Sequence, residues 1–304
     1  MPRMPRPAIL LLLTGFWTVS GGRAQPSLRV EVLARSVAPG EAVRILVRSS
    51  VALVSVEGSF LGEPLFFAGR QDAGDDALPR NEWWAWAAVG LDEEPGPGSV
   101  EIRGRTGEGL EVRRSKPVRV AAKRFPTQRL EVESRYVTPA LETLARIQKE
   151  RERLAAVYSN RRASAPSPGP FQRPVPGEAT STFGTRRIFN GEPRDPHPGL
   201  DLRAAAGTPV QASGPGRVAL AQDLYFSGQT VILDHGGGLF TVYAHLSRME
   251  VKEGDEVGEG QVVGLAGATG RVTGPHLHWG AKVGDRPFDP TALLDPRLFP
   301  PKLR

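Results

Sequence analysis

Cysteine is absent from this sequence of 304 residues. No disulfide can form, so the fold has to be stabilised by burial of apolar surface, which a chain of this length can provide. The same absence excludes a thiol nucleophile and a metal site with cysteine ligands. Histidine is scarce, with five in the whole chain, so histidines that gather in one region point to a specific role.

An apolar run long enough to span a bilayer is also missing. Residues 1–24 begin with Arg3 and Arg6, continue with a short apolar run from Ala8, and end with Gly22, Arg23 and Ala24. This order is typical of a secretory signal peptide that is cleaved after Ala24. The alternative is an uncleaved anchor, but a spanning helix needs about 20 apolar residues and this run is shorter. We therefore predict export to the periplasm or the exterior, with no stable membrane span in the mature chain.

A strong excess of one charge is missing as well. The formal net charge is +6, and removal of the leader, which holds three arginines and no acidic residue, lowers it to +3. Such an excess is compatible with an anionic cell-wall polymer as partner. The sequence has no basic block with interleaved aromatic residues, so we predict no nucleic-acid partner.

Residues 27–123 consist of short runs in which apolar and polar residues alternate. This alternation, broken by turn residues such as Pro-Gly, predicts half-buried strands. About seven strands in roughly 95 residues favour an immunoglobulin-like β-sandwich. Trp84 and Trp86 share one face of a predicted strand that also contains Trp83. We interpret the three tryptophans as packing residues rather than a ligand platform.

Residues 136–160 have a helical pattern, with apolar residues three or four positions apart from Leu141 to Val157. Thr138 is the predicted N-cap, and Pro139 fits the first helical position. The pattern predicts an amphipathic connecting helix. A coiled coil is the alternative, but the pattern lasts only about three heptads and Arg151 interrupts it.

Residues 161–177 contain five prolines, which is typical of a linker. Residues 178–296 are rich in glycine and in strand-like runs such as Thr230-Val231-Ile232-Leu233, and they predict an all-β domain with many tight turns. The predicted fold class is therefore mainly β. It comprises an N-terminal sandwich, a connecting helix and a glycine-rich C-terminal domain.

Four of the five histidines lie in three motifs of this C-terminal domain. In "HPGLD", Pro198 and Gly199 disfavour a helix, so His197 and Asp201 are expected to converge across a turn. Histidine nitrogen and aspartate oxygen are both zinc ligands, although one such pair is a weak signal.

The second motif is "HLH". On a strand, His276 and His278 would lie about 6 to 7 Å apart on one face, close enough to share a metal ion or its bound water. Leu277 and Trp279 would then occupy the buried face. In the third motif, "YAHLS", His245 ends a predicted strand and by itself would be interpreted as a structural histidine.

In this order, H-x-x-x-D, Y-A-H-L and H-L-H resemble the lysostaphin-type (LytM-like) zinc endopeptidases of bacterial cell walls. The resemblance covers residues 175–290 and includes "STFGTRR" and "GATGRVTGPHLHWG". It implies a duplicated-hybrid-motif-like peptidase domain. It also implies that His197, Asp201 and His278 bind zinc and that His245 and His276 flank the metal-bound water and the reacting carbonyl. None of these five positions departs from the family pattern.

Three protein ligands leave a position of zinc open for water, as in catalytic rather than structural sites. Zinc lowers the pKa of this water to about 7. One of His245 and His276 would act as general base, and the other would bind the oxyanion or protonate the leaving amine. The chain has no H-E-x-x-H motif, so no glutamate base is available in that arrangement.

The remaining polar residues of these motifs have more ordinary interpretations. His235 is expected to make a structural or outer hydrogen bond. Tyr243 is interpreted as a wall of the substrate groove or a donor to substrate. Arg186 and Arg187 either contact an anionic peptide or lie on a solvated face.

The resemblance implies hydrolysis of peptidoglycan stem peptides or cross-links. The N-terminal module lies outside the resemblance and is expected to position the catalytic domain, to contact a cell-wall or divisome partner, or to shield the groove. One alternative is a non-catalytic LytM-like module that binds cell wall or activates another hydrolase, although all the site residues are present. A lipoyl- or biotinyl-carrier fold is the other alternative. It needs a lysine at a hairpin tip, and Lys252 is not in that position.

Overall fold

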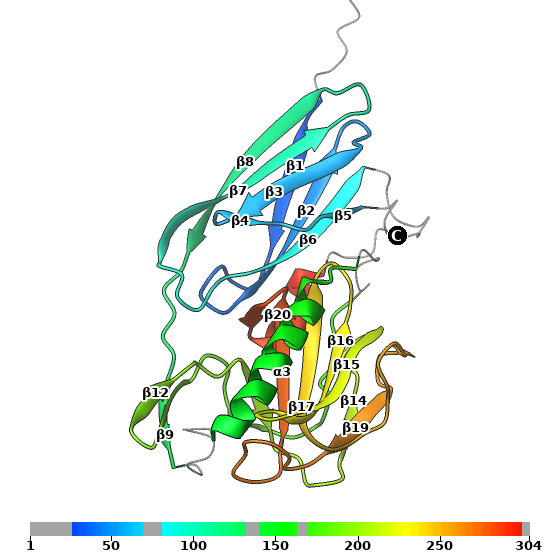
Figure 1. Ribbon diagram of the computed structural model, residues 1–304. Coiled ribbons are helices and arrows are strands. Elements are labelled where there is room, and N and C mark those ends of the chain that lie inside the picture. Colours follow the sequence, from blue (N-terminus) through cyan, green and yellow to red (C-terminus); the bar gives the residue numbers. More distant parts are fainter. Residues whose placement is uncertain (1–25, 70–80, 132–139, 163–168, 300–304) are drawn as a thin grey trace, which may run out of the picture.

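The protein is described by a computed structural model, which covers residues 26–69, 81–131, 140–162 and 169–299. The predicted signal peptide, residues 1–24, lies outside these residues and stays a prediction. Within the described ranges, no helix has the length and apolar character that crossing a bilayer requires. The chain is mainly β, as predicted, and its described part contains one α-helix (Figure 1).

Two four-stranded antiparallel sheets form the N-terminal sandwich, the blue-to-cyan part of Figure 1. Their inward side chains form one apolar core, which includes Ile45 and Val47 of one sheet and Val100 and Ile102 of the other. The described part of the sandwich thus contains eight strands where the sequence predicted about seven. The first sheet has the order β1 (Leu28–Leu33), β2 (Ala42–Ser49), β6 (Glu82–Ala88), β5 (Ala68–Gly69), and the second has the order β4 (Glu63–Pro64), β3 (Ser55–Phe60), β7 (Gly96–Arg105), β8 (Glu111–Val120).

A ten-stranded antiparallel sheet forms the C-terminal domain. Short strands separated by glycine turns build it, as the sequence predicted, and Trp279 is fully buried in its core. Two short 3-10 helices follow the last strand, at Pro290–Leu294 and Pro296–Leu298. The strands are β10 (Ala179–Ser181), β13 (Gly199–Leu202), β14 (Pro209–Gln211), β15 (Gly216–Leu224), β16 (Gly228–Asp234), β17 (Leu239–Met249), β18 (Glu256–Val257), β19 (Val262–Ala266), β20 (Leu277–Val283) and β21 (Arg286–Phe288).

The predicted connecting helix exists as α3 (Leu141–Ser159), which lies across the C-terminal domain in Figure 1. Val157 and Tyr158 pack on Ile232 and Phe240, so the C-terminal part of the helix packs on the sheet. Leu141 and Leu144, at the start of the predicted apolar stripe, are exposed. The prediction of Thr138 as the N-cap of this helix was wrong. The N-cap of α3 is Ala140, which makes no side-chain cap hydrogen bond. Residues 132–139, which include the predicted first turn, lie outside the described residues.

The prediction of a linker at residues 161–177 also needs correction. Residues 163–168 lie outside the described part, but residues 169–177 pack on the C-terminal domain. Phe171 and Val175 are 4% and 3% exposed, and the Phe171 amide donates to the Leu293 carbonyl at 2.9 Å. Proline content alone suggested a linker, whereas two large apolar side chains between the prolines bury the segment.

A small three-stranded sheet joins the two domains. It has the order β12 (Glu192–Arg194), β11 (Arg186–Phe189), β9 (Thr127–Leu130). Strand β9 follows the sandwich directly and pairs in parallel with β11, with Gln128 opposite Arg187. Just before β9, the Phe125 ring covers Gly184, and a side chain at Gly184 would overlap the ring. The chain that leaves the sandwich is therefore part of the C-terminal domain.

The sandwich packs directly on the C-terminal domain. Trp84 and Trp86 project from the outer face of β6 into a buried cluster with Phe288 and Phe299. The rings of Trp86 and Phe299 meet edge to face, with centroids 5.9 Å apart. This agrees with the interpretation of the tryptophans as packing residues. The contact they make is between domains.

Ion pairs surround this apolar contact. Arg35 of the sandwich donates to the Thr291 hydroxyl at 2.7 Å and pairs with Asp289. Arg286 of the C-terminal domain pairs with Glu63 of the sandwich. Apolar burial and cross-domain charges together hold the two domains in one arrangement.

We expect Trp86→Ala to lower the free energy of unfolding by about 3 to 5 kcal/mol, because it removes a large buried ring from the interface between the domains. Chemical denaturation measures this change. Val54→Ala, at an apolar position that is 55% exposed, is the control and is expected to change stability by less than about 0.5 kcal/mol. Equal unfolding free energies for the two variants would show that the interface contributes nothing.

Candidate metal centre

The pairing of β13 with β20 places Asp201 directly opposite His278. Directly opposed residues of an antiparallel pair project from the same face, so their side chains meet. His197 lies just before β13, and the turn through Pro198 and Gly199 brings its ring to the same point. Gly199 is required here, because a Cβ would lie 2.6 Å from the imidazole of His278.

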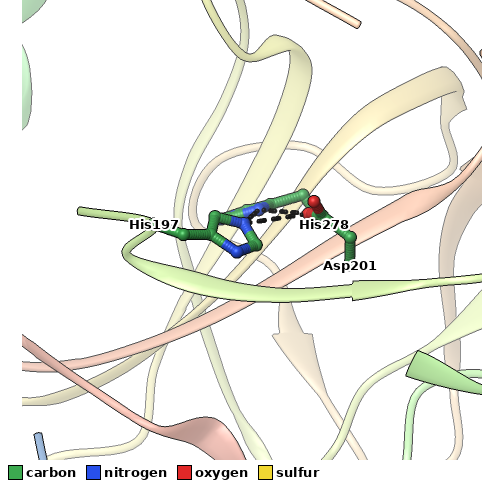
Figure 2. A group of neighbouring side chains, drawn as sticks. All are labelled: His197, Asp201 and His278. Atoms are coloured by element: carbon green, nitrogen blue, oxygen red, sulfur yellow. Dashed lines mark hydrogen bonds and ion pairs between the residues drawn. The ribbon is translucent and has the colours of Figure 1, made fainter. Parts of the chain in front are cut away.

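Three atoms of these side chains form a nearly regular triangle (Figure 2). His197 Nε2 lies 3.0 Å from Asp201 Oδ1, His278 Nδ1 lies 3.0 Å from the same oxygen, and the two nitrogens are 3.0 Å apart. Ligand bonds of about 2.1 Å around tetrahedral zinc separate the ligand atoms by about 3.4 Å. The two imidazoles and the carboxylate thus fit one face of a zinc tetrahedron.

Burial prepares the protonation states that a metal needs. It lowers the pKa of His197 to about 4, so this imidazole is neutral near pH 7. Burial alone would raise the pKa of Asp201, but hydrogen bonds with His197 and His278 outweigh it and hold this pKa well below its usual range. A neutral imidazole and a carboxylate are the forms that bind a metal ion.

Contacts outside the triangle orient two of its members. His197 Nδ1 lies 3.1 Å from the Thr182 carbonyl. With a metal ion bound, this carbonyl would hold the ring proton on Nδ1 and leave the Nε2 lone pair for the ion. Asp201 Oδ2, the carboxylate oxygen outside the triangle, accepts a hydrogen bond from Arg187 at 3.0 Å. This role of Arg187 was not predicted from the sequence. The only sequence signal was its place in the "FGTRR" segment shortly before His197.

His245 and His276 lie beside the triangle. Their ring centroids are 4.9 Å apart, and His245 lies 5.9 Å from the His278 ring. The Nδ1 atoms of His245 and His276 each lie 2.9 Å from a backbone carbonyl, that of Thr269 and Gly274 respectively. Each ring therefore carries its proton on Nδ1 and leaves Nε2 free as an acceptor. The structure thus brings together all five residues that the sequence predicted for the site.

A break in strand β17 turns His245 toward the site. Its neighbours Tyr243 and Leu246 are fully buried in the core, and the pairing with β16 gains one extra residue between them. His245 has φ of 62°, in the left-handed region that residues other than glycine seldom adopt. Such strain is found mainly where function requires a side chain in a particular place.

This break also corrects the prediction for Tyr243. Strand alternation placed Tyr243 on the same face as His245, as a groove wall, but Tyr243 is fully buried. Its hydroxyl accepts a hydrogen bond from the Ser213 amide at 2.8 Å and lies 3.0 Å from the Thr241 hydroxyl. His235 belongs to the same buried chain, 2.7 Å from Thr241 Oγ1 and 2.7 Å from the Pro215 carbonyl. The interpretation of His235 as structural agrees with these contacts.

We expect the metal-free protein to lose stability as the pH falls from about 6.5 to about 4. Burial lowers the pKa of His235 to about 4, so the unfolded chain binds this proton first. Between these pH values the unfolded state binds more protons than the folded state. The free energy of unfolding therefore decreases as the pH is lowered, by up to about 3 kcal/mol for one such histidine.

Denaturation at a series of pH values between about 7 and 4 tests this expectation. His235→Asn is the matched variant: it removes one titrating group, so its unfolding free energy should fall less steeply over the same range. Parallel curves for the two proteins would contradict the role of His235.

Comparison with known proteins gives one family and several relatives. The profile of "Peptidase family M23" matches residues 195–290. Peptidoglycan DD-endopeptidase ShyA of Vibrio cholerae is 44% identical over 123 residues, which are 39% of this chain and 29% of ShyA. DD-carboxypeptidase/endopeptidase Mpg of Neisseria meningitidis is 41% identical over 100 residues, 33% of this chain and 23% of Mpg. This chain thus matches less than a third of the length of either relative.

A solved structure resembles a larger part of the chain. The crystal structure of an M23 protein from Pseudomonas aeruginosa aligns with a TM-score of 0.63 and 30% sequence identity. The alignment covers 85% of this chain and 95% of that chain, so it extends well beyond the residues that the family profile matches.

Proposed function

Because the chain belongs to peptidase family M23, we propose that it is an exported zinc metalloendopeptidase that hydrolyses peptide bonds in peptidoglycan stem peptides or cross-links. The observation that carries the proposal is the triangle of His197 Nε2, Asp201 Oδ1 and His278 Nδ1, with sides of 3.0 Å. The similarity to a peptidoglycan DD-endopeptidase supports the choice of substrate.

The donor set of the triangle suits zinc. Two imidazole nitrogens and one carboxylate oxygen are typical ligands of catalytic zinc sites, where three protein atoms leave one position open. When bound there, a zinc ion lowers the pKa of a coordinated water to about 7 and polarises a carbonyl. His197, Asp201 and His278 would hold the ion.

His245 and His276 would handle protons beside the ion. Burial, followed by the proximity of His278 and His276, lowers the pKa of His245 to about 3, so its free Nε2 is an acceptor at pH 7. One of these two histidines takes a proton from the attacking water. The other hydrogen-bonds the developing oxyanion or protonates the leaving amine.

The fixed position of the N-terminal sandwich supports a role in substrate or partner contact. Its sheet β4-β3-β7-β8 contributes no residue to the buried apolar cluster with the C-terminal domain, so the outer face of this sheet could contact cell wall or a divisome protein. A non-catalytic LytM-like module is the second candidate. The full set of His197, Asp201, His245, His276 and His278 disfavours it.

Digestion of purified peptidoglycan, with products identified by mass spectrometry, tests the proposal. We expect the wild-type protein to contain about one zinc per chain and to release peptides whose masses fit hydrolysis of a peptide bond. His278→Ala removes a ligand and is expected to lose both zinc and cleavage.

His245→Ala separates metal binding from catalysis. It is expected to keep about one zinc per chain and to cleave about 100-fold to 10,000-fold more slowly, because it removes a proton-transfer group and no ligand. A wild-type protein that binds zinc and releases no peptide would favour the non-catalytic module.

A further inference from the structure

Asp201 uses its two carboxylate oxygens for different partners. Oδ1 lies 3.0 Å from both His197 Nε2 and His278 Nδ1, at the corner of the triangle. Oδ2 accepts the hydrogen bond from Arg187 Nη2 at 3.0 Å. The Asp201 and Arg187 side chains are only 12% and 18% exposed, so water competes little for this contact.

We propose that Arg187 is a positioning residue that restricts Asp201 to one-oxygen coordination, an inference that rests on the metal site of the proposed function. A carboxylate can bind a cation through one oxygen or through both. Because Arg187 holds Oδ2, only Oδ1 is directed at the two histidines. The position that a second carboxylate oxygen would fill then stays open for water and for the substrate carbonyl.

The backbone of Arg187 is held from both sides. Strand β11 lies between β12 and β9, with Arg187 opposite Arg194 on one side and Gln128 on the other. The Arg186 amide donates to the Pro126 carbonyl at 2.8 Å at the start of this pairing. The guanidinium is thus carried on a strand that the chain leaving the N-terminal sandwich fixes in place.

Stability alone is a poor explanation for this ion pair. The guanidinium is largely buried, so its contact with Asp201 has to offset the loss of hydration of both charged groups. Its Nε is also buried without a hydrogen-bond partner among the residues that the structure describes. Buried ion pairs are often no more stable than apolar replacements, so orientation of Asp201 explains this contact better than stability does.

Arg186 supplies a matched control. It is the preceding residue of the same strand and carries the same charge, but it is exposed and its side chain alternates to the other face. Arg186→Gln therefore repeats the change in net charge and in strand composition. It leaves the contact with Asp201 in place.

The test compares Arg187→Gln, Arg187→Lys and Arg186→Gln in the full-length protein. Zinc affinity is measured by competition with a chelator, and the visible spectrum of the cobalt(II)-substituted protein reports the coordination number. We expect Arg187→Gln to weaken zinc binding about 10-fold to 100-fold, as for other outer contacts of metal ligands. We also expect its cobalt absorption to weaken, because Asp201 is then free to bind through both oxygens. Arg187→Lys should recover part of the affinity, and Arg186→Gln should match the wild type.

Unchanged zinc affinity and an unchanged cobalt spectrum in Arg187→Gln would overturn the proposal. If Arg187→Gln does not fold, Arg187→Met takes its place, because its unbranched side chain has no donor for Asp201 Oδ2. An altered cobalt spectrum in the folded protein then supports a positioning role, and a wild-type spectrum overturns it. These readouts do not depend on cleavage. A wild-type protein that binds zinc without cutting peptidoglycan would disprove the proposed function and leave this inference standing.

Discussion

The candidate metal centre depends on the register between β13 and β20. This register puts Asp201 opposite His278, and a shift of one residue would turn one of the two side chains to the other face. The opposite face of the same strand pair is apolar. Leu202, Leu277 and Trp279 are fully buried there, and Leu200 is 4% exposed. Burial of these apolar side chains therefore fixes where the polar ligands meet.

An irregularity of strand β17 in the same sheet positions His245. Regular alternation along β17 would send His245 into the core with Tyr243, and the extra residue with its left-handed backbone sends it to the metal side. The Thr269 side chain stabilises this break by bonding the Gln229 amide and the Leu246 carbonyl, at 2.9 Å and 2.7 Å. The Thr269 carbonyl also orients the imidazole. One loop residue thus supports the backbone and selects the tautomer.

The N-terminal sandwich is connected to the site through the backbone as well as through the domain interface. Strand β9 extends from the sandwich to pair with β11, which carries Arg187 to Asp201. The packing of Phe125 on Gly184 holds the start of the segment that leads to β11. The conformation of the chain that leaves one domain is therefore part of the surroundings of the candidate metal ligands in the other.

The sequence by itself determined the fold class, because strand alternation and glycine turns are local patterns. Through the family resemblance of H-x-x-x-D, Y-A-H-L and H-L-H, it also supplied the five candidate residues that the structure brings together. Composition gave a wrong prediction where tertiary packing determines the structure. The prolines of residues 169–177 suggested a linker, but Phe171 and Val175 of this segment are buried. Only the tertiary structure decided that Tyr243 lies in the core, that Trp84 and Trp86 face the other domain and that Arg187 bonds Asp201. These features depend on a strand bulge, a domain interface and a pairing between distant segments, and local patterns in a sequence do not encode contacts between residues far apart in the chain.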